Sequence, residues 1–128
     1  MTQDMIDNNP LLKHCFQLSL KIMAYTDLLE GMRKYPMARQ LFKSGTAIGA
    51  LSMEAQNAES RADFIHKMKI AAKEAEETQY WLMLCQQSGG YPPSDEILAQ
   101  LQEIQRIVGS ILKTAKKNSN PQAEHNEL

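Results

Sequence analysis

Residues 97–115 carry the clearest structural pattern in the chain, with the sequence ILAQLQEIQRIVGSILKTA. Apolar residues recur there at alternating intervals of four and three: Ile97, Leu101, Ile104, Val108, Ile111 and Ala115. Because an α-helix has 3.6 residues per turn, this spacing keeps the apolar side chains on one face. The stretch therefore predicts an amphipathic helix that packs against other helices.

The same spacing occurs in three further segments, within residues 11–32, 37–58 and 64–85. At 1.5 Å per residue, each of the four helices would be about 30 Å long. In the first segment a parallel row is expected to widen the buried face: Leu12, Phe16, Ser19 and Met23. Helices of equal length joined by short connections favour antiparallel neighbours. The prediction is an all-α fold, an up-down-up-down antiparallel four-helix bundle.

Capping residues set the expected boundaries of these helices. Asn9 precedes Pro10 in the pattern of an N-cap followed by proline at the first helical position. Ser60 with Asp63 resembles a capping box, and Ser94 is expected to cap the last helix. The predicted helices span residues 10–32, 36–58, 61–87 and 95–117.

Length and composition limit the class of protein. The 128 residues suit one domain, with a core over about residues 9–118 and a flexible tail at 119–128. Hydrophobic residues make up 43% and charged residues 23%, which is ordinary globular usage. The chain offers no apolar run long enough for a membrane span and no signal-peptide pattern at its start. A cytoplasmic protein that does not bind membranes is expected.

The second predicted helix is rich in small residues, including Gly45 and Gly49 four positions apart. Each glycine inside a helix costs about 1 kcal/mol relative to alanine, so another interaction must offset that cost. One interpretation is close packing against a bulky neighbour such as Trp81 or Phe64. The other is a flat surface for a second subunit or a ligand. Tyr80 and Trp81 either cover a helix crossing or anchor a subunit interface.

Residues with catalytic or metal-binding chemistry are sparse. Asp63 and His66 form a single Asp-x-x-His, whereas a di-iron bundle needs two Glu-x-x-His motifs. Cys15 and Cys85 fall on apolar stripes and are expected to be buried, reduced thiols. The sequence contains no phosphate-binding loop or nucleophile elbow. We therefore expect no metal, no cofactor and no enzyme activity.

Positive charge gathers around the connection between the first two predicted helices. Lys plus Arg is 14 against 15 for Asp plus Glu, so the net charge is −1. Between Glu30 and Glu54, however, the chain has no acidic residue and contains four basic ones: Arg33, Lys34, Arg39 and Lys43. This cluster is either a solvated rim or a site for phosphate groups. A symmetric oligomer would repeat it into a ring of charge.

Several stretches resemble a known family. They are residues 40–50 (QLFKSGTAIGA), 63–67 (DFIHK), 73–82 (KEAEETQYWL) and 111–116 (ILKTAK). Over about residues 9–118 the chain resembles the four-helix-bundle family named after proteins encoded in intervening sequences of bacterial 23S rRNA genes. The resemblance implies a bacterial, non-enzymatic bundle that forms homopentameric rings. A relative of the family is the accessory variability protein of diversity-generating retroelements, a basic pentamer that binds nucleic acid and a reverse transcriptase.

The chain differs from this family pattern in two respects. It has Leu51-Ser52 where the family often has Asn-Ile, and its net charge of −1 lacks the basic excess of the retroelement relative. Two functional hypotheses follow. The first is a homo-oligomeric interaction module that recruits a protein partner. The second is an RNA- or DNA-binding module that uses the basic cluster.

Overall fold

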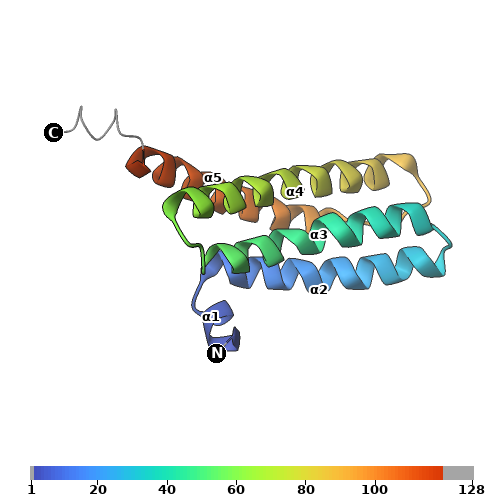
Figure 1. The fold of residues 1–128 in the computed structure, drawn as a ribbon. Coiled ribbons are helices and arrows are strands. Elements are labelled where there is room, and N and C mark those ends of the chain that lie inside the picture. The colour runs from blue at the N-terminus through green and yellow to red at the C-terminus, as the bar shows by residue number, and fades with distance from the viewer. Residues whose placement is uncertain (1, 120–128) are drawn as a thin grey trace.

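The computed structural model describes residues 2–119, and four long α-helices dominate it (Figure 1). They are α2 (Pro10–Gly31), α3 (Tyr35–Ala55), α4 (Arg61–Ser88) and α5 (Asp95–Ser119). The described residues contain no strand. The predicted all-α class and four-helix bundle are confirmed, and the helix ends lie within three residues of those expected. The predicted tail at 119–128 falls, beyond Ser119, outside the described residues.

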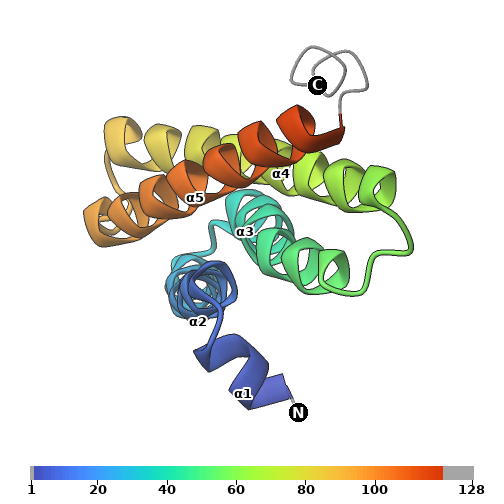
Figure 2. The ribbon, with the colours of Figure 1, turned by 90° about the vertical axis from the view of Figure 1, so that its left-hand side faces the viewer.

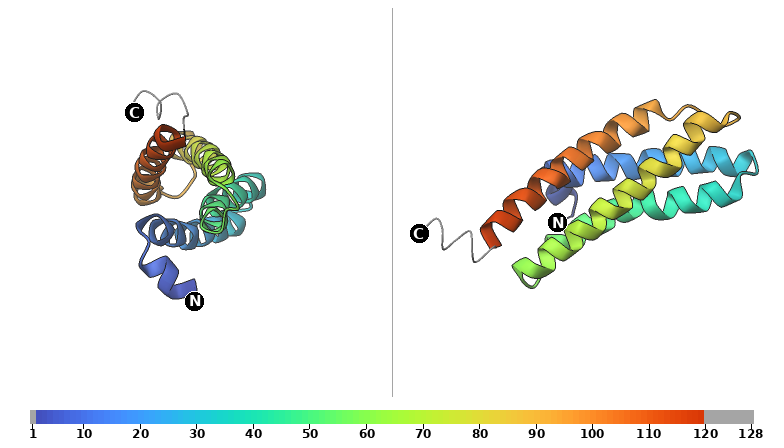
Figure 3. Two further views of the ribbon diagram at one scale, coloured as in Figure 1. Left: turned by 60° about the vertical axis from the view of Figure 1, so that its left-hand side comes forward. Right: turned by 90° about the horizontal axis from the view of Figure 1, so that it is seen from above.

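The long helices pack as a closed series of antiparallel neighbours. α3 lies between α2 and α4, and α5 contacts both α4 and α2, whereas the backbones of the diagonal pairs lie farther apart. α4 and α5 run obliquely to α2 (Figure 2). As a result, the start of α4 and the end of α5 extend beyond α2 and α3 at one end of the bundle (Figure 3).

Two helix starts follow the predicted capping chemistry. The Asn9 side chain accepts a hydrogen bond from the backbone N–H of Leu12 at 3.2 Å, directly before Pro10. At the start of α4, Ser60 Oγ accepts from the Asp63 N–H at 3.0 Å, while Asp63 Oδ2 accepts from the Glu59 N–H at 3.1 Å. The bonds from Leu12 and Asp63 satisfy donors that the first helical turn leaves without a partner, and the bond from Glu59 fixes the residue before the N-cap.

The predicted side-chain cap of α5 is wrong. The Ser94 carbonyl accepts from the Leu98 N–H at 2.9 Å, as expected at this position. Its hydroxyl, however, is buried and has no hydrogen-bond partner among residues 2–119. Asp95 and Glu96 instead place negative charge in the first turn, where it stabilises the positive end of the helix dipole.

A short helix, α1 (Thr2–Asp7), precedes the bundle and was not predicted. Within the described residues it contacts α2 alone, and it projects away from α4 and α5 (Figure 2). Ile6 anchors it, with 7% of its surface exposed. Six residues are too few to show a repeating stripe, and helices this short depend on tertiary contacts.

The core confirms the four principal stripes but not the parallel row of the first helix. Leu18, Ile22, Leu41, Met68, Leu82, Leu101 and Ile104 are fully buried. In the parallel row Leu12 is buried, but Phe16 and Met23 are 44% and 45% exposed. α2 contacts α3 and α5 through its principal stripe, so the bundle does not cover this row.

The connection between α2 and α3 is a tight turn with a left-handed residue. Arg33 has φ 62°, the only positive φ outside glycine in the described chain. The Lys34 N–H donates to the Leu29 carbonyl at 2.8 Å, and the Arg33 N–H donates to the Glu30 carbonyl at 2.9 Å. These two bonds define a Schellman motif, whose left-handed position usually holds glycine.

We expect Arg33→Gly to stabilise the fold. A left-handed conformation costs a residue with a Cβ roughly 1 to 2 kcal/mol, and glycine avoids that cost. The free energy of unfolding should rise by about 1 kcal/mol. The greater flexibility of glycine in the unfolded chain reduces this gain. Urea denaturation measures it. Arg33→Ala is the control, because it removes the same charge but keeps the Cβ. An equal gain in both variants would show that charge, and not backbone strain, is responsible.

Candidate interaction surfaces

The four basic residues of the predicted cluster are spread over two elements. Arg33 and Lys34 lie in the turn between α2 and α3, whereas Arg39 and Lys43 are exposed on α3. Lys34 Nζ sits 4.3 Å from the centre of the Tyr91 ring, in a cation–π contact. Lys34 is therefore partly engaged within the chain.

Lys43 faces acidic residues of α4. Burial raises the pKa of the Glu74 carboxyl, the nearby Glu77 raises it further, and Lys43 acts in the opposite direction. Lys43 is thus close enough to Glu74 for their charges to interact. Arg33 and Arg39 form no ion pair within residues 2–119. These two arginines hold the least compensated charge of the cluster.

The small-residue face of α3 packs against α2. A Cβ added at Gly45 would lie 2.8 Å from Cγ1 of Ile22, and one added at Gly49 would lie 3.2 Å from Cβ of Cys15. The expected neighbours, Trp81 or Phe64, are therefore wrong. The reason is that both glycines lie on the side of α3 that faces α2, whereas those aromatic residues belong to α4.

The contact of α3 with α4 contains a buried polar pair within a largely apolar core. Ser44 and Thr78 are both fully buried, and their hydroxyl groups form a hydrogen bond of 2.9 Å between α3 and α4. Thr78 also bonds the Glu74 carbonyl at 2.8 Å, so the buried hydroxyls are satisfied. The sequence alone does not reveal this pair, because the two residues lie 34 positions apart in the chain.

An apolar groove runs along the outer side of α1, α2 and α3, and the sequence did not predict it. Its volume is about 470 Å³. Phe16, Met23 and Phe42 line it and remain 44% to 46% exposed. Gly49 and Ala50 leave room along its α3 side. The signal was present in the sequence, in the parallel row of α2, but that row was assigned to the core.

Tyr80 and Trp81 lie on the outer face of α4 and differ in environment. Tyr80 is 58% exposed, while Trp81 is half-buried and packs against the core. Their rings meet edge to face with centres 5.4 Å apart. The Trp81 indole N–H donates to a Glu77 carboxylate oxygen at 3.3 Å. Trp81 therefore covers the bundle, and Tyr80 is the accessible member of the pair.

The cysteines are buried, as predicted, and both are free thiols. Burial raises the pKa of the Cys15 thiol to about 11, although a contact with Ser52 lowers it slightly. This thiol is accordingly protonated and unreactive near neutral pH. Asp63 is engaged in the cap of α4 and pairs with Lys67 at 3.8 Å, while His66 is exposed. Among the described residues no group of three potential ligands could hold a metal ion.

Comparison with known proteins identifies the family. A family model described as "23S rRNA-intervening sequence protein" matches residues 7–110. The chain belongs to this family. It is also similar to a crystal structure of a protein with unknown function from the S23 ribosomal protein family of Bacteroides thetaiotaomicron VPI-5482. That match has a TM-score of 0.77 and 36% identity, and covers 80% of this chain and 98% of the other. A search of curated proteins gave no match.

Membership of the 23S rRNA-intervening sequence family confirms the resemblance seen in the sequence. It assigns no activity, because the structural relative is itself described as having unknown function. The family match begins at residue 7 and so leaves out all but the last residue of α1. Within residues 2–119, none of the helices of this family member has the length and apolar character needed to cross a membrane.

Gly45→Ala should destabilise the protein. The new methyl group would lie 2.8 Å from Cγ1 of the fully buried Ile22, and overpacking costs about 1 to 3 kcal/mol. Alanine is the better helix former by about 1 kcal/mol, so the net loss should be smaller. The matched control is Gly109→Ala, where the added Cβ meets nothing within 4 Å. Thermal melts should show a fall for the first variant and a rise for the second. Equal rises would refute close packing at Gly45.

Proposed function

We propose that this chain is a non-enzymatic interaction module that assembles with copies of itself, as a pentamer, and presents a surface to a protein partner. The observation that carries the proposal is the apolar groove on α2 and α3. Soluble proteins rarely leave large contiguous apolar surfaces exposed, and such surfaces mark interaction sites. Family membership supports the pentamer, since the resemblance implies five-membered rings.

The composition of the groove favours a helix of another subunit as its occupant. Aromatic residues and methionine are enriched at the centres of protein interfaces, and Phe16, Met23 and Phe42 stand together here. Ala50 on the α3 side is small and exposed, so it allows another helix to approach the backbone of α3 closely. Within residues 2–119 no charged side chain lines the groove, so association would bury no unpaired charge from these residues.

The absence of an assigned chemical site agrees with a role in assembly. The two cysteines are buried, and Asp63 is committed to a cap and an ion pair. The surface features that remain are apolar, aromatic or basic. Such features support binding and not catalysis.

Met23→Glu should dissociate the assembly. A carboxylate at a half-exposed groove position is tolerated in the monomer, but at an apolar interface it would have to lose its hydration. Light scattering at micromolar concentration should give about five times the 14.5 kDa chain mass for the parent and 14.5 kDa for the variant. The control is Leu28→Glu on the same helix, at a residue that is 57% exposed and outside the groove.

The results separate the proposal from its alternatives. A parent mass of 14.5 kDa would refute self-assembly, and a dimer would refute the pentamer alone. If Tyr80→Glu dissociates the assembly while Met23→Glu does not, the interface lies on α4. Circular dichroism confirms that each variant keeps its helices.

The alternative function is that of an RNA- or DNA-binding accessory protein. The specific observation that favours it is Arg33, which keeps a left-handed backbone where glycine would be unstrained. Strained residues of this kind persist where the side chain serves a purpose. Arg33 and Arg39 lack ion-pair partners among the described residues, so both are available to phosphate groups. A ring of subunits would multiply this weak field.

Gel-shift titration at several salt concentrations tests nucleic-acid binding. If the arginines contact phosphates, affinity falls steeply as salt rises, and Arg39→Gln lowers the slope of log affinity against log salt by about one per contact. Lys69→Gln, an exposed residue on α4, is the control and should leave the slope unchanged. Absence of a shift at low salt, or equal effects of both variants, would refute use of the basic cluster.

A further inference from the structure

The end of the bundle where α4 starts and α5 ends contains a pocket between these two helices. It has a volume of about 620 Å³, within the range of about 300 to 1,000 Å³ typical of small-molecule sites. It lies away from the basic cluster and from the α2–α3 groove, and it shares no lining residue with either. The pocket exists because α4 and α5 extend past α2 and α3, which leaves one side of their contact uncovered (Figure 3).

One side of the pocket is apolar. Phe64 of α4 and Ile111 of α5 are partly buried and pack against the core, and Ala115 lies one turn further along α5. The apolar side chains are thus held in place by the bundle while part of their surface still faces the pocket. A flat apolar group could rest on them and be removed from water.

The other side carries neutral polar groups at a helical spacing. Ser110, Thr114 and Asn118 follow each other at four-residue intervals along one edge of α5. Their hydroxyl and amide groups form no hydrogen bond within residues 2–119. They offer both donors and acceptors to a ligand.

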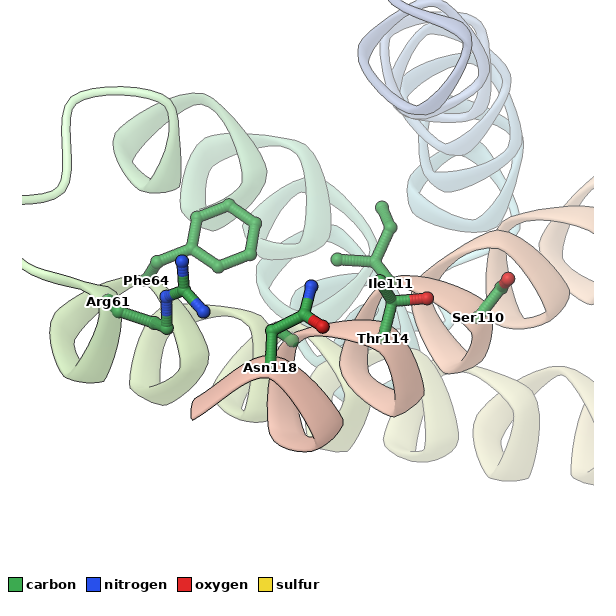
Figure 4. Close-up of a pocket in the computed structure, with 7 residues that line it drawn as sticks. Arg61, Phe64, Ser110, Ile111, Thr114 and Asn118 are labelled. Atoms are coloured by element: carbon green, nitrogen blue, oxygen red, sulfur yellow. The ribbon is translucent and has the colours of Figure 1, made fainter. Parts of the chain in front are cut away.

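Arg61 supplies the charge of the pocket. It extends from the start of α4 toward Asn118 on the last turns of α5, beside the Phe64 ring (Figure 4). Its guanidinium has no ion pair within the described residues, and no acidic residue lines the pocket. Helix stability does not account for it, because a cation in the first turn of a helix opposes the helix dipole.

We infer that this pocket binds a small aromatic carboxylate. The ring would lie on Phe64 and Ile111, and Arg61 would receive the carboxylate through the paired N–H groups that match its geometry. Thr114 and Asn118 would donate further hydrogen bonds to the carboxylate oxygens. Lys113 and Lys117, which flank this edge of α5, add to the positive potential. The inference is independent of the proposed assembly.

Ligand-detected NMR on the full chain tests the site with 2-naphthoate and its uncharged counterpart 2-naphthylmethanol. The parent should bind naphthoate at least ten times more tightly than the alcohol. Arg61→Gln should remove that difference, and Ala115→Phe, which fills the pocket, should abolish binding of both probes. Lys69→Gln is the control, an exposed cation on α4 outside the pocket that should change neither affinity.

Each outcome supports or overturns the inference. Thermal melts show whether the variants are folded. No binding of naphthoate by the parent would overturn the inference. So would equal binding of the two probes, or naphthoate binding that survives both pocket variants. An equal loss in Arg61→Gln and Lys69→Gln would show attraction to surface charge in general and would overturn the inference. If Ala115→Phe unfolds the protein, Thr114→Trp is the replacement variant, because Thr114 is exposed at the same pocket.

Discussion

The close approach of α3 to α2 at Gly45 is the constraint on which the rest of the structure depends. Ile22 occupies the space that a side chain at Gly45 would need, and it is completely buried. Two helices in such contact cannot rotate or slide without a clash, because protein interiors are close-packed. Their relative position therefore fixes which residues of α2 and α3 face the core and which remain outside.

The apolar groove follows from that fixed position. With Ile22 against Gly45, the row of α2 that includes Phe16 and Met23 lies beside the outer edge of α3, next to Phe42. These side chains lie at the edge of the α2–α3 pair, and no other long helix covers them. α3 therefore packs tightly against α2 on one face and borders the apolar groove on another. The packing that stabilises the fold thus also forms the surface available for assembly.

The two ends of the bundle differ in how closely α4 and α5 are held against α2 and α3. At the turn between α2 and α3, the cation–π contact of Lys34 with Tyr91 and the hydrogen bond from the Tyr25 hydroxyl to the Pro92 carbonyl, 2.8 Å long, hold the α4–α5 loop against the bundle. At the other end the start of α4 and the end of α5 extend beyond α2 and α3 (Figure 3), and Arg61, which has no ion pair within residues 2–119, lines a pocket there. Local polar contacts thus hold the helices together at the end with the α2–α3 turn, whereas the pocket at the other end is available for the proposed ligand.

The sequence by itself determined the helices, because a stripe such as Ile97 to Ala115 and a cap such as Asn9 act through neighbours within one or two turns. It also determined the family, and that Cys15 would be buried. Only the tertiary structure decided the partner of Gly45, the exposure of Phe16, the burial of the Ser94 hydroxyl and the existence of α1. Each depends on which helix lies across from it and at what angle, and the periodicity of a single helix carries no information about its neighbour. The candidate surfaces are of this second kind, since the groove and the pocket combine residues from helices that are distant in the chain.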